Sequence, residues 1–282
     1  MEDILTVMSK IVSVQDISCF GQCSLTVALP VLSAYGIETA ILPGAILSNH
    51  TAKGFTGWTF HDLTDEFPKI LERWLTEKIS FDAFYTGYVT ATQIPYIREI
   101  MEKTARPGAL KIVDPAMADN GVLYAGFAPD FPKTMATLCN GADFVLPNIT
   151  EASFLLGATY KESGYDKKYV EDLCKGLHSL GAKNVVLTGV SFESDKLGVA
   201  VYAGASTSYY FRDRLNAQMH GTGDVYAASF TGALLNGKSV MDSAAIAAEY
   251  VAESMRLTLD DKDHWYGVKF EKAIPYVIEK IK

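Results

Sequence analysis

Short runs of apolar, β-branched residues alternate with longer amphipathic stretches along most of this chain. Lys10–Gln15 (KIVSVQ) is typical of a buried strand, whereas Thr64–Lys78 carries its apolar side chains at helical spacing. Strands and helices that alternate favour a mostly parallel sheet with helices on both faces. We therefore expect an α/β fold, a three-layer α/β/α sandwich around a mostly parallel sheet, with residues 1–282 in a single domain.

The same patterns predict the individual elements. The expected strands are Lys10–Gln15, Thr39–Leu42, Phe81–Tyr85, Leu110–Val113, Phe144–Leu146 and Asn184–Thr188, with an antiparallel pair at Gly198–Ala203 and Ser206–Phe211. The expected helices are Ser24–Tyr35, Thr64–Lys78, Gln93–Thr104, Phe131–Cys139, Asn148–Leu156, Lys168–Leu180, Gly223–Asn236, Val240–Leu257 and Glu271–Ile281. Asp16–Gln22 is expected to form a turn, and the polar segment Ser48–Gly57 a loop long enough to reach over a site.

Composition and charge exclude several functions. The net charge of −8 argues against nucleic acid as a partner, because binding to phosphate backbones favours basic surfaces. No apolar run reaches the roughly 18 residues that span a membrane, and Met1-Glu2-Asp3 is acidic where a signal peptide is basic. The four cysteines form no CxxC pair, which is typical of reduced thiols in a cytoplasmic protein.

A glycine-rich turn precedes a helix at His220-Gly221-Thr222-Gly223-Asp224. The first N–H groups of a helix lack internal partners and carry the positive end of its dipole. Glycines let an anion approach those groups closely, and a carboxylate stands beside them. The turn therefore fits phosphoryl transfer to a hydroxyl, although an Asp at a helix start is also a common structural feature.

Polar residues stand where the predicted strands end. In a parallel sheet such residues meet at one edge, where ligands bind outside the carboxyl ends of the strands. We expect this edge to lie near the glycine-rich turn. The residues are Asp16, Tyr88, Asp114, Asn148 and Thr188.

A second glycine motif has the wrong context for a phosphate site. Gly232–Ser239 (GALLNGKS) matches the P-loop pattern GxxxxGK[ST]. A P-loop must follow a strand and open a helix. This segment instead reads as the end of a helix that is capped by Gly237.

Five short motifs occur in the order and approximate spacing of one known family. They are Ser48-Asn49-His50-Thr51, Thr86-Gly87-Tyr88, Asp114-Pro115, Pro147-Asn148-x-x-Glu151 and Gly221-Thr222-Gly223-Asp224. On these motifs the chain resembles the pyridoxal kinases of the ribokinase-like superfamily over nearly its whole length. The first two motifs discriminate the pyridoxal kinases, whereas the last two specify only the superfamily.

The resemblance implies an ATP-dependent kinase that phosphorylates the 5′-hydroxymethyl group of pyridoxal, pyridoxine or pyridoxamine. By the same match, Asp224 would be the base near that hydroxyl. Gly221, Thr222 and Gly223 would form the anion hole for the transferring phosphoryl group, with Thr222 also on ATP. The resemblance implies Mg²⁺ with ATP as co-substrate, allows for a monovalent cation and implies a homodimer.

The nucleotide site is implied in the same way. Asn148 and Glu151 would face the phosphates of ATP and Mg²⁺, and Asp114 would lie near the same metal. Thr188 and Gly189 would pass close to ATP. From the residues alone, Asn148 and Glu151 also form a good capping box, and Asp114 before a proline is also a turn former.

For the vitamin, the resemblance implies that Thr51 and Tyr88 hold the pyridine ring. Two positions depart from the family. Asp16 stands where relatives usually have a serine that touches the ring, and Leu47 stands where an aromatic residue is common. An aspartate there can accept a hydrogen bond from a protonated pyridine nitrogen or from the 3-hydroxyl, or it can signal another substrate.

Two rival functions stay open. Asp16 is compatible with a kinase that acts on hydroxymethylpyrimidine, a thiamin precursor, and the same fold can serve a vitamin-binding protein that does not catalyse. The segment Arg212–Met219 before the turn is short for a lid, so contact of Arg212 or Arg214 with ATP phosphates is undecided. His50 also fits a plain loop residue, and His220 is a weaker candidate base than Asp224.

Overall fold

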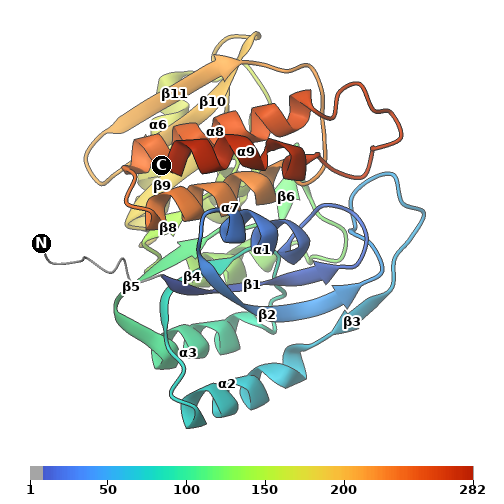
Figure 1. The fold of residues 1–282 in the computed structure, drawn as a ribbon. Helices are drawn as coiled ribbons and strands as arrows, with labels where there is room; N and C mark the ends of the chain where they lie inside the picture. The colour runs from blue at the N-terminus through green and yellow to red at the C-terminus, as the bar shows by residue number, and fades with distance from the viewer. Residues whose placement is uncertain (1–8, 282) are drawn as a thin grey trace, which may run out of the picture.

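Strands and helices alternate through residues 9–281, which are the residues that the computed structural model describes (Figure 1). The strands are β1 Lys10–Ser18, β2 Glu38–Leu47, β3 Phe60–Asp62, β4 Phe81–Thr86, β5 Ala105–Val113, β6 Ala118–Asp119, β7 Val122–Leu123, β8 Phe144–Val145, β9 Asn184–Val190, β10 Lys196–Tyr202 and β11 Thr207–Asp213. The helices are α1 Leu25–Ala34, the 3₁₀ turn η1 Thr64–Glu66, α2 Phe67–Thr76, α3 Ile94–Thr104, α4 Phe131–Cys139, α5 Ile149–Leu156, α6 Lys167–Ser179, α7 Thr222–Leu235, α8 Val240–Arg256 and α9 Phe270–Ile281.

Nine of the described strands form one sheet, in the order β11-β10-β9-β8-β5-β4-β1-β2-β3. The stretch from β2 to β9 is parallel, as predicted. Antiparallel pairing is confined to the two ends, where β3 joins β2 and the β10–β11 pair joins β9. The separate pair β6–β7 lies outside this sheet.

Side chains of the central strands point alternately into two hydrophobic cores. In β9, Val185 and Leu187 lie in one core and Val186 lies in the other, because successive side chains of a strand leave opposite faces. The first core also holds buried residues of α2 to α6, and the second holds those of α1, α7, α8 and α9. These three layers confirm the predicted α/β/α sandwich.

The structure corrects the prediction around the first two strands. β1 continues to Ser18, so Asp16 belongs to a strand and not to a turn. Its register against β2 shifts between Gln15 and Ile17, after which Ser18 pairs with Leu47. The longer β2 supplies backbone partners for these extra residues. Their own polar sequence does not indicate a strand, because the strand depends on this pairing.

The rejected P-loop is the end of α7, as predicted. The helix stops at Leu235, and Gly237 follows with φ 79°, a left-handed conformation that suits glycine at a helix end. Its backbone N–H donates to the carbonyl of Leu234. The segment thus follows a helix and not a strand, and Ser239 at its end caps α8 by accepting from the backbone N–H of Asp242.

Other predictions about the chain as a whole have mixed outcomes. Among residues 9–281, no helix is both long and apolar enough to cross a membrane. All four cysteines are free thiols; Cys139 and Cys174 are buried, while Cys23 is half-buried and Cys19 is exposed. The acidic stretch Met1–Asp3 lies outside the described residues.

Candidate functional site

Two cavities adjoin at the carboxyl edge of the parallel strands. The first has a volume of about 420 Å³ and is lined by Asp16, Leu47, Thr51, Tyr88, Gly221 and Asp224, among others. The second has a volume of about 300 Å³ and is lined by Asp114, Asn148, Glu151, Thr188, Gly189 and Arg212, among others. The two cavities share a wall of four residues, which are Asp119, Tyr124, Thr222 and Gly223.

The glycine-rich turn forms part of this shared wall and begins α7. Gly221 has φ 79°, and a Cβ atom at this position would overlap the carbonyl oxygen of Gln22. Only glycine fits this close approach to the loop after β1. Thr222 and Gly223 then present the start of the helix to both cavities.

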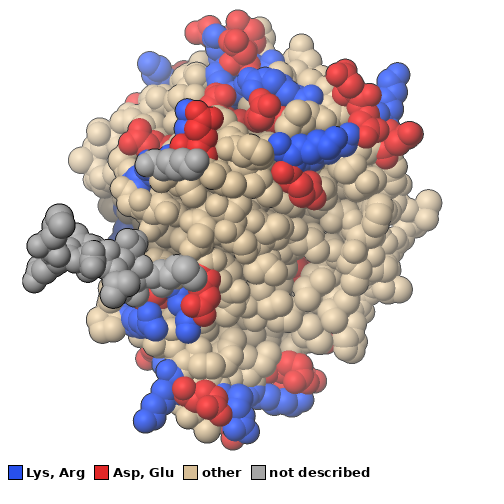
Figure 2. Space-filling view, in the orientation of Figure 1, with Lys and Arg blue, Asp and Glu red and all other residues tan. Residues whose placement is uncertain are grey.

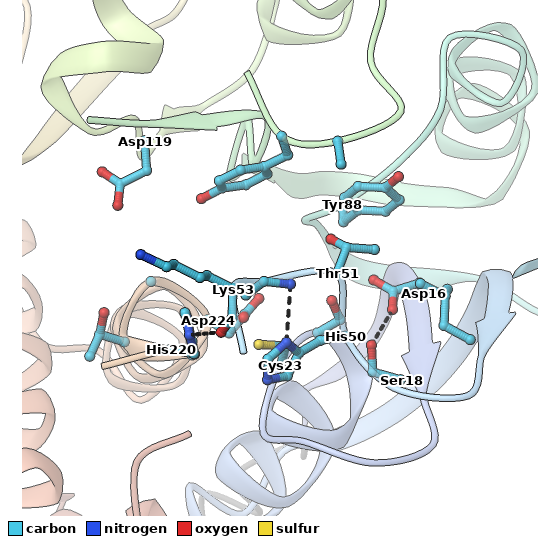
Figure 3. Close-up of a pocket in the computed structure, with 18 of the residues that line it drawn as sticks. Asp16, Ser18, Cys23, His50, Thr51, Lys53, Tyr88, Asp119, His220 and Asp224 are labelled. Atoms are coloured by element: carbon cyan, nitrogen blue, oxygen red, sulfur yellow. Dashed lines mark hydrogen bonds between the residues drawn. The ribbon is translucent and has the colours of Figure 1, made fainter. Parts of the chain in front are cut away.

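Asp224 lines the first cavity directly beside the turn (Figure 3). Burial, together with the nearby charge of Asp16, raises the pKa of its carboxyl from 3.8 to about 7, although the backbone N–H of Ser24 opposes the shift. A carboxylate whose pKa lies near neutral pH is suited to accept a proton during catalysis.

The remaining predicted acceptor residues also face the first cavity. Asp16 is only 4% exposed, and the hydroxyl of Ser18 donates a 2.8 Å hydrogen bond to its Oδ2 atom. Burial raises the pKa of Asp16, so a neutral carboxyl is favoured more than in water. The ring of Tyr88 lies 5.0 Å from that of Phe127, which fixes one side of the cavity.

The second cavity contains a buried carboxylate without a protein hydrogen-bond donor. Within residues 9–281, no donor reaches the side-chain oxygens of Asp114, which is 7% exposed. Burial, together with the charges of Glu151 and Asp224, raises the pKa of Asp114 well above its usual value. A bound cation would relieve this concentration of negative charge.

Glu151 has a structural task that is visible in its hydrogen bonds. Its Oε2 accepts from the backbone N–H of Asn148, and its Oε1 accepts from that of Met117. The Asn148 side chain caps α5 in return by accepting from the N–H of Glu151. Burial still raises the pKa of Glu151 to about 8. The capping-box interpretation is thus confirmed, and it leaves Glu151 few free lone pairs.

Metal binding by protein ligands alone is not supported in the described part of the chain. Residues 9–281 contain no group of three or more His, Cys, Asp or Glu side chains arranged to hold an ion. Mg²⁺ commonly takes only one or two carboxylates and completes its shell with water and substrate phosphates. Asp114 fits that sparse donor set.

The two arginines before the turn have different positions. Arg212 lines the second cavity, but its Nε atom pairs with Glu249 Oε1 at 3.0 Å. Arg214 is not part of either cavity lining, and its backbone N–H donates to the carbonyl of Asp195. Of the two, only Arg212 is placed to meet a ligand.

Sequence reasoning missed part of the shared wall. Asp119 ends β6 and Tyr124 follows β7 in the β6–β7 hairpin, whose turn residues Asn120 and Gly121 have φ 50° and 77°. Positive φ at both positions is typical of a type I′ turn, and Asn-Gly is its strongest sequence signal. That dipeptide was present in the sequence and would have predicted the hairpin.

Sequence reasoning also left two members of the Ser48–Gly57 loop unassigned. His50 is buried, not a surface residue, and its Nε2 donates to the carbonyl of Tyr266 at 2.8 Å. Lys53 lines the first cavity from the same loop. No local pattern marks either residue, because both positions depend on contacts with the 264–266 segment and with the glycine-rich turn.

Comparison with known proteins fits this site. The phosphomethylpyrimidine kinase family model matches residues 45–268. A pyridoxal kinase from Dictyostelium discoideum is 27% identical over 205 residues, and a pyridoxine kinase from Bacillus subtilis is 30% identical over 193. The matched regions cover 68% and 64% of this chain, and 63% and 66% of those proteins, so the chain spans less than two thirds of either relative.

A solved structure matches over a longer part of the chain. A Bacteroides thetaiotaomicron protein named after the phosphomethylpyrimidine kinases, in a crystal form with pyridoxal, superposes with a TM-score of 0.90 at 34% identity. The superposition covers 96% of each chain. The chain therefore belongs to the phosphomethylpyrimidine kinase family and has the ribokinase-like fold of the pyridoxal kinases.

Proposed function

We propose that this protein is an ATP-dependent kinase that phosphorylates the 5′-hydroxymethyl group of pyridoxal, pyridoxine or pyridoxamine. The observation that carries the proposal is the meeting of two cavities at Thr222 and Gly223, next to Asp224 in the first cavity. A vitamin in the first cavity and ATP in the second would bring a hydroxyl and a phosphoryl group to the same turn. The relative that is seen with pyridoxal supports the choice of acceptor.

In the proposed reaction, the acceptor oxygen forms a bond to the γ-phosphorus while the bond between that phosphorus and the β,γ-bridging oxygen breaks. ADP leaves with the electron pair, and the hydroxyl proton passes to Asp224. The N–H groups at Gly221, Thr222 and Gly223 would hold the oxygens of the transferring group. Little covalent work is left to the protein, so positioning and electrostatics account for most of the catalysis.

The acceptor would be held by residues of the first cavity. Tyr88 and Thr51 would contact the pyridine ring, and Leu47 would close its apolar side. Asp16, a buried carboxyl that lines this cavity, is suited to a hydrogen bond with the ring nitrogen or the 3-hydroxyl.

ATP would occupy the second cavity. The apolar side chains of Ala248, Val251 and Met255 on α8 offer a surface for the adenine ring, and Thr188 and Gly189 stand at the opposite wall. Asp114 would hold the Mg²⁺ that accompanies ATP, with Asn148 and Glu151 fixing the backbone beside it. Bound Mg²⁺ would offset charge on the phosphates. We assign no residue to the monovalent cation that the resemblance allows.

The proposal is tested by a coupled assay of ADP release with the three vitamers and with hydroxymethylpyrimidine. We expect turnover with at least one vitamer and a lower kcat/KM with the pyrimidine. ATP consumption that does not depend on any vitamer, or binding of pyridoxal without ADP release, would show that the proposal is wrong. The second of these results would favour a vitamin-binding protein.

Phosphorylation of hydroxymethylpyrimidine is the second candidate function. The name of the matching family model favours it, and so does Asp16, because a carboxyl can pair with an aminopyrimidine as well as with a pyridine. The same assay separates the two acceptors directly.

We also propose that the protein is a cytoplasmic homodimer. Figure 2 shows charged residues gathered at the top and bottom of one face, with a broad uncharged band across the middle, where α1 and β2 lie in Figure 1. Exposed apolar side chains on these elements and on β3 include Leu29, Ile41, Ile46 and Phe60. A large apolar surface of this kind is typical of a contact with a second copy. Sedimentation should show a dimer, and Ile46→Glu with Phe60→Glu should shift it to a monomer.

A further inference from the structure

The two cavities contain many carboxylates and few cations. Asp16, Asp119 and Asp224 line the first cavity, and Asp114 and Glu151 line the second. Lysine and arginine contribute only Lys53 to the first lining and Arg212 to the second. A phosphoryl group brings further negative charge into these acidic cavities. The position of each cation therefore matters for the proposed reaction.

Of the two cations, only Lys53 is available to a ligand without breaking an ion pair. Arg212 pairs with Glu249 at 3.0 Å, and Glu249 also accepts a hydrogen bond from the hydroxyl of Tyr210. Among residues 9–281, no carboxylate lies within 4.0 Å of the Lys53 ammonium group. The Lys53 side chain is thus not engaged in an ion pair and can contact a ligand that enters the cavity.

The direction of the Lys53 side chain favours the phosphoryl group over the acceptor ring. In Figure 3 the side chain extends toward the Asp119 side of the cavity and away from Tyr88 and Asp16. Asp119 belongs to the wall that both cavities share, together with Thr222. The ammonium group therefore points toward the boundary that a transferring group would cross.

The backbone of Lys53 is tied to the glycine-rich turn. The Nε2 atom of His220, the residue before Gly221, donates a 2.8 Å hydrogen bond to the Lys53 carbonyl. On the other side, Phe55 packs with ring-centre distances of 4.8 Å to both His50 and Trp265. Gly54, which lies between Lys53 and Phe55 in the chain, has φ 122°, and a Cβ atom there would clash with the Trp265 ring. These contacts hold an otherwise exposed loop beside the start of α7.

We propose that Lys53 is a catalytic residue of the phosphoryl-transfer step, and that His220 is its positioning residue. This inference rests on the proposed kinase function. The Lys53 ammonium group would donate to an oxygen of the γ-phosphoryl group as the bond to the acceptor oxygen forms and the bond to ADP breaks. The ammonium group neither gains nor loses a proton in this step. The same geometry gives His220 a positioning task, because its Nε2 proton is donated to the Lys53 carbonyl.

The test compares Lys53→Met and Lys53→Arg with the wild-type protein, using Lys133→Met as the matched control. Lys133 is an exposed lysine on α4 outside both cavities. We expect Lys53→Met to lower kcat by about a hundredfold, the scale of one lost electrostatic contact to a transition state. The KM for the acceptor should change little, and Lys53→Arg should recover part of the rate. Lys133→Met should match the wild type.

A binding readout separates a role in the transition state from a structural role. ADP with aluminium fluoride mimics the planar transferring group, so Lys53→Met should weaken binding of this mimic while binding of ADP alone is unchanged. Equal kcat values for Lys53→Met and the wild type, or equal affinity for the mimic, would overturn the inference. If the wild type itself releases no ADP with any acceptor, it is the kinase function that fails, so the two failures are distinct.

The choice of acceptor tests another role for the same lysine. Pyridoxal carries an aldehyde that an amine can capture, whereas pyridoxine does not. The proposed role predicts the same loss of kcat with both acceptors. A loss with pyridoxal alone would assign Lys53 to the aldehyde and overturn the inference.

His220 is tested through its coupling to Lys53. We expect His220→Ala to lower kcat when it is made in the wild-type protein. Made in the Lys53→Met protein, the same substitution should lower kcat no further, because the two changes remove the same contact. His220→Gln, whose amide can still donate to the Lys53 carbonyl, should recover activity. Additive effects of His220→Ala and Lys53→Met would contradict the positioning role.

Discussion

The two cavities are built from different parts of the fold. The second is walled by strand ends and by α7 and α8, which belong to regular elements. The first takes much of its lining from connecting segments, such as residues 50–53 and 219–221, that meet only through tertiary contacts. The comparison teaches that, under the proposed function, the fold would hold its site for ATP on rigid elements while loops define the site for the acceptor.

We expect the largest effect from a substitution that removes the proposed base and leaves both cavities intact. Asp224→Asn keeps the size of the side chain but cannot accept the hydroxyl proton, so kcat should fall by roughly a hundredfold or more. Asp172→Asn, a change of an exposed aspartate on α6, should leave kcat unchanged. Steady-state kinetics and thermal unfolding check the prediction, and near wild-type turnover in folded Asp224→Asn would remove Asp224 from its proposed role.

The next prediction concerns the pH dependence of the same group. Since burial raises the pKa of Asp224 to about 7, the basic form is lost as the pH falls through 7, and kcat/KM should fall with it. The raised pKa also means that this carboxyl lowers the stability of the folded state as the pH rises from 3.8 to about 7, and fully above 7, so Asp224→Asn should increase the melting temperature most above pH 7. Rate profiles and melting curves across pH 5–9 measure both effects. The variant Asp224→Glu offers a further check if it is active. An acidic limb far below pH 7 in its rate profile would contradict the assignment of this limb to residue 224.

A smaller effect should be confined to the first cavity. Asp16→Ser removes a buried carboxyl that faces the acceptor, so the KM for the vitamer should rise by about tenfold, the scale of one lost hydrogen bond to a charged or polar partner. The KM for ATP should stay the same, because Asp16 does not line the second cavity. Equal changes in both constants would show that the two cavities are not independent.

The smallest effect should be confined to the second cavity. Arg212→Ala removes a cation that already pairs with Glu249, so we expect the KM for ATP to rise only about threefold with kcat unchanged. The KM for the vitamer should not move. A loss of kcat as large as that expected for Lys53→Met would mean that Arg212, and not Lys53, supplies the main positive charge.

The contrast between the cavities also explains which features were predictable from the sequence. The alternation of strands and helices located β5, β8 and β9, and with them Asp114, Asn148 and Thr188 at the edge of the sheet. Those positions follow from local periodicity and from the geometry of a parallel sheet. The roles of these residues remain predictions.

The features that were missed depend on partners distant in sequence. β3 is three exposed residues that form a strand only because β2 lies beside them. Asp16 lies in a strand because β2 extends to Leu47, and Lys53 faces the cavity because His220 binds its carbonyl. The β6–β7 hairpin is different, since the Asn120-Gly121 signal was present and went unused.

The β6–β7 hairpin also bears on how such an enzyme can diversify. Asp119 and Tyr124 are exposed to both cavities at once. A substitution at this part of the shared wall would alter the fit of both proposed substrates together. These positions are therefore poorly suited to a change of acceptor alone. Asp16, Leu47 and Thr51 line only the first cavity, the proposed acceptor site, so they could change without disturbing a nucleotide in the second. New acceptor specificities should therefore arise through the ends of β1 and β2 and the loop after β2, while the hairpin stays as it is.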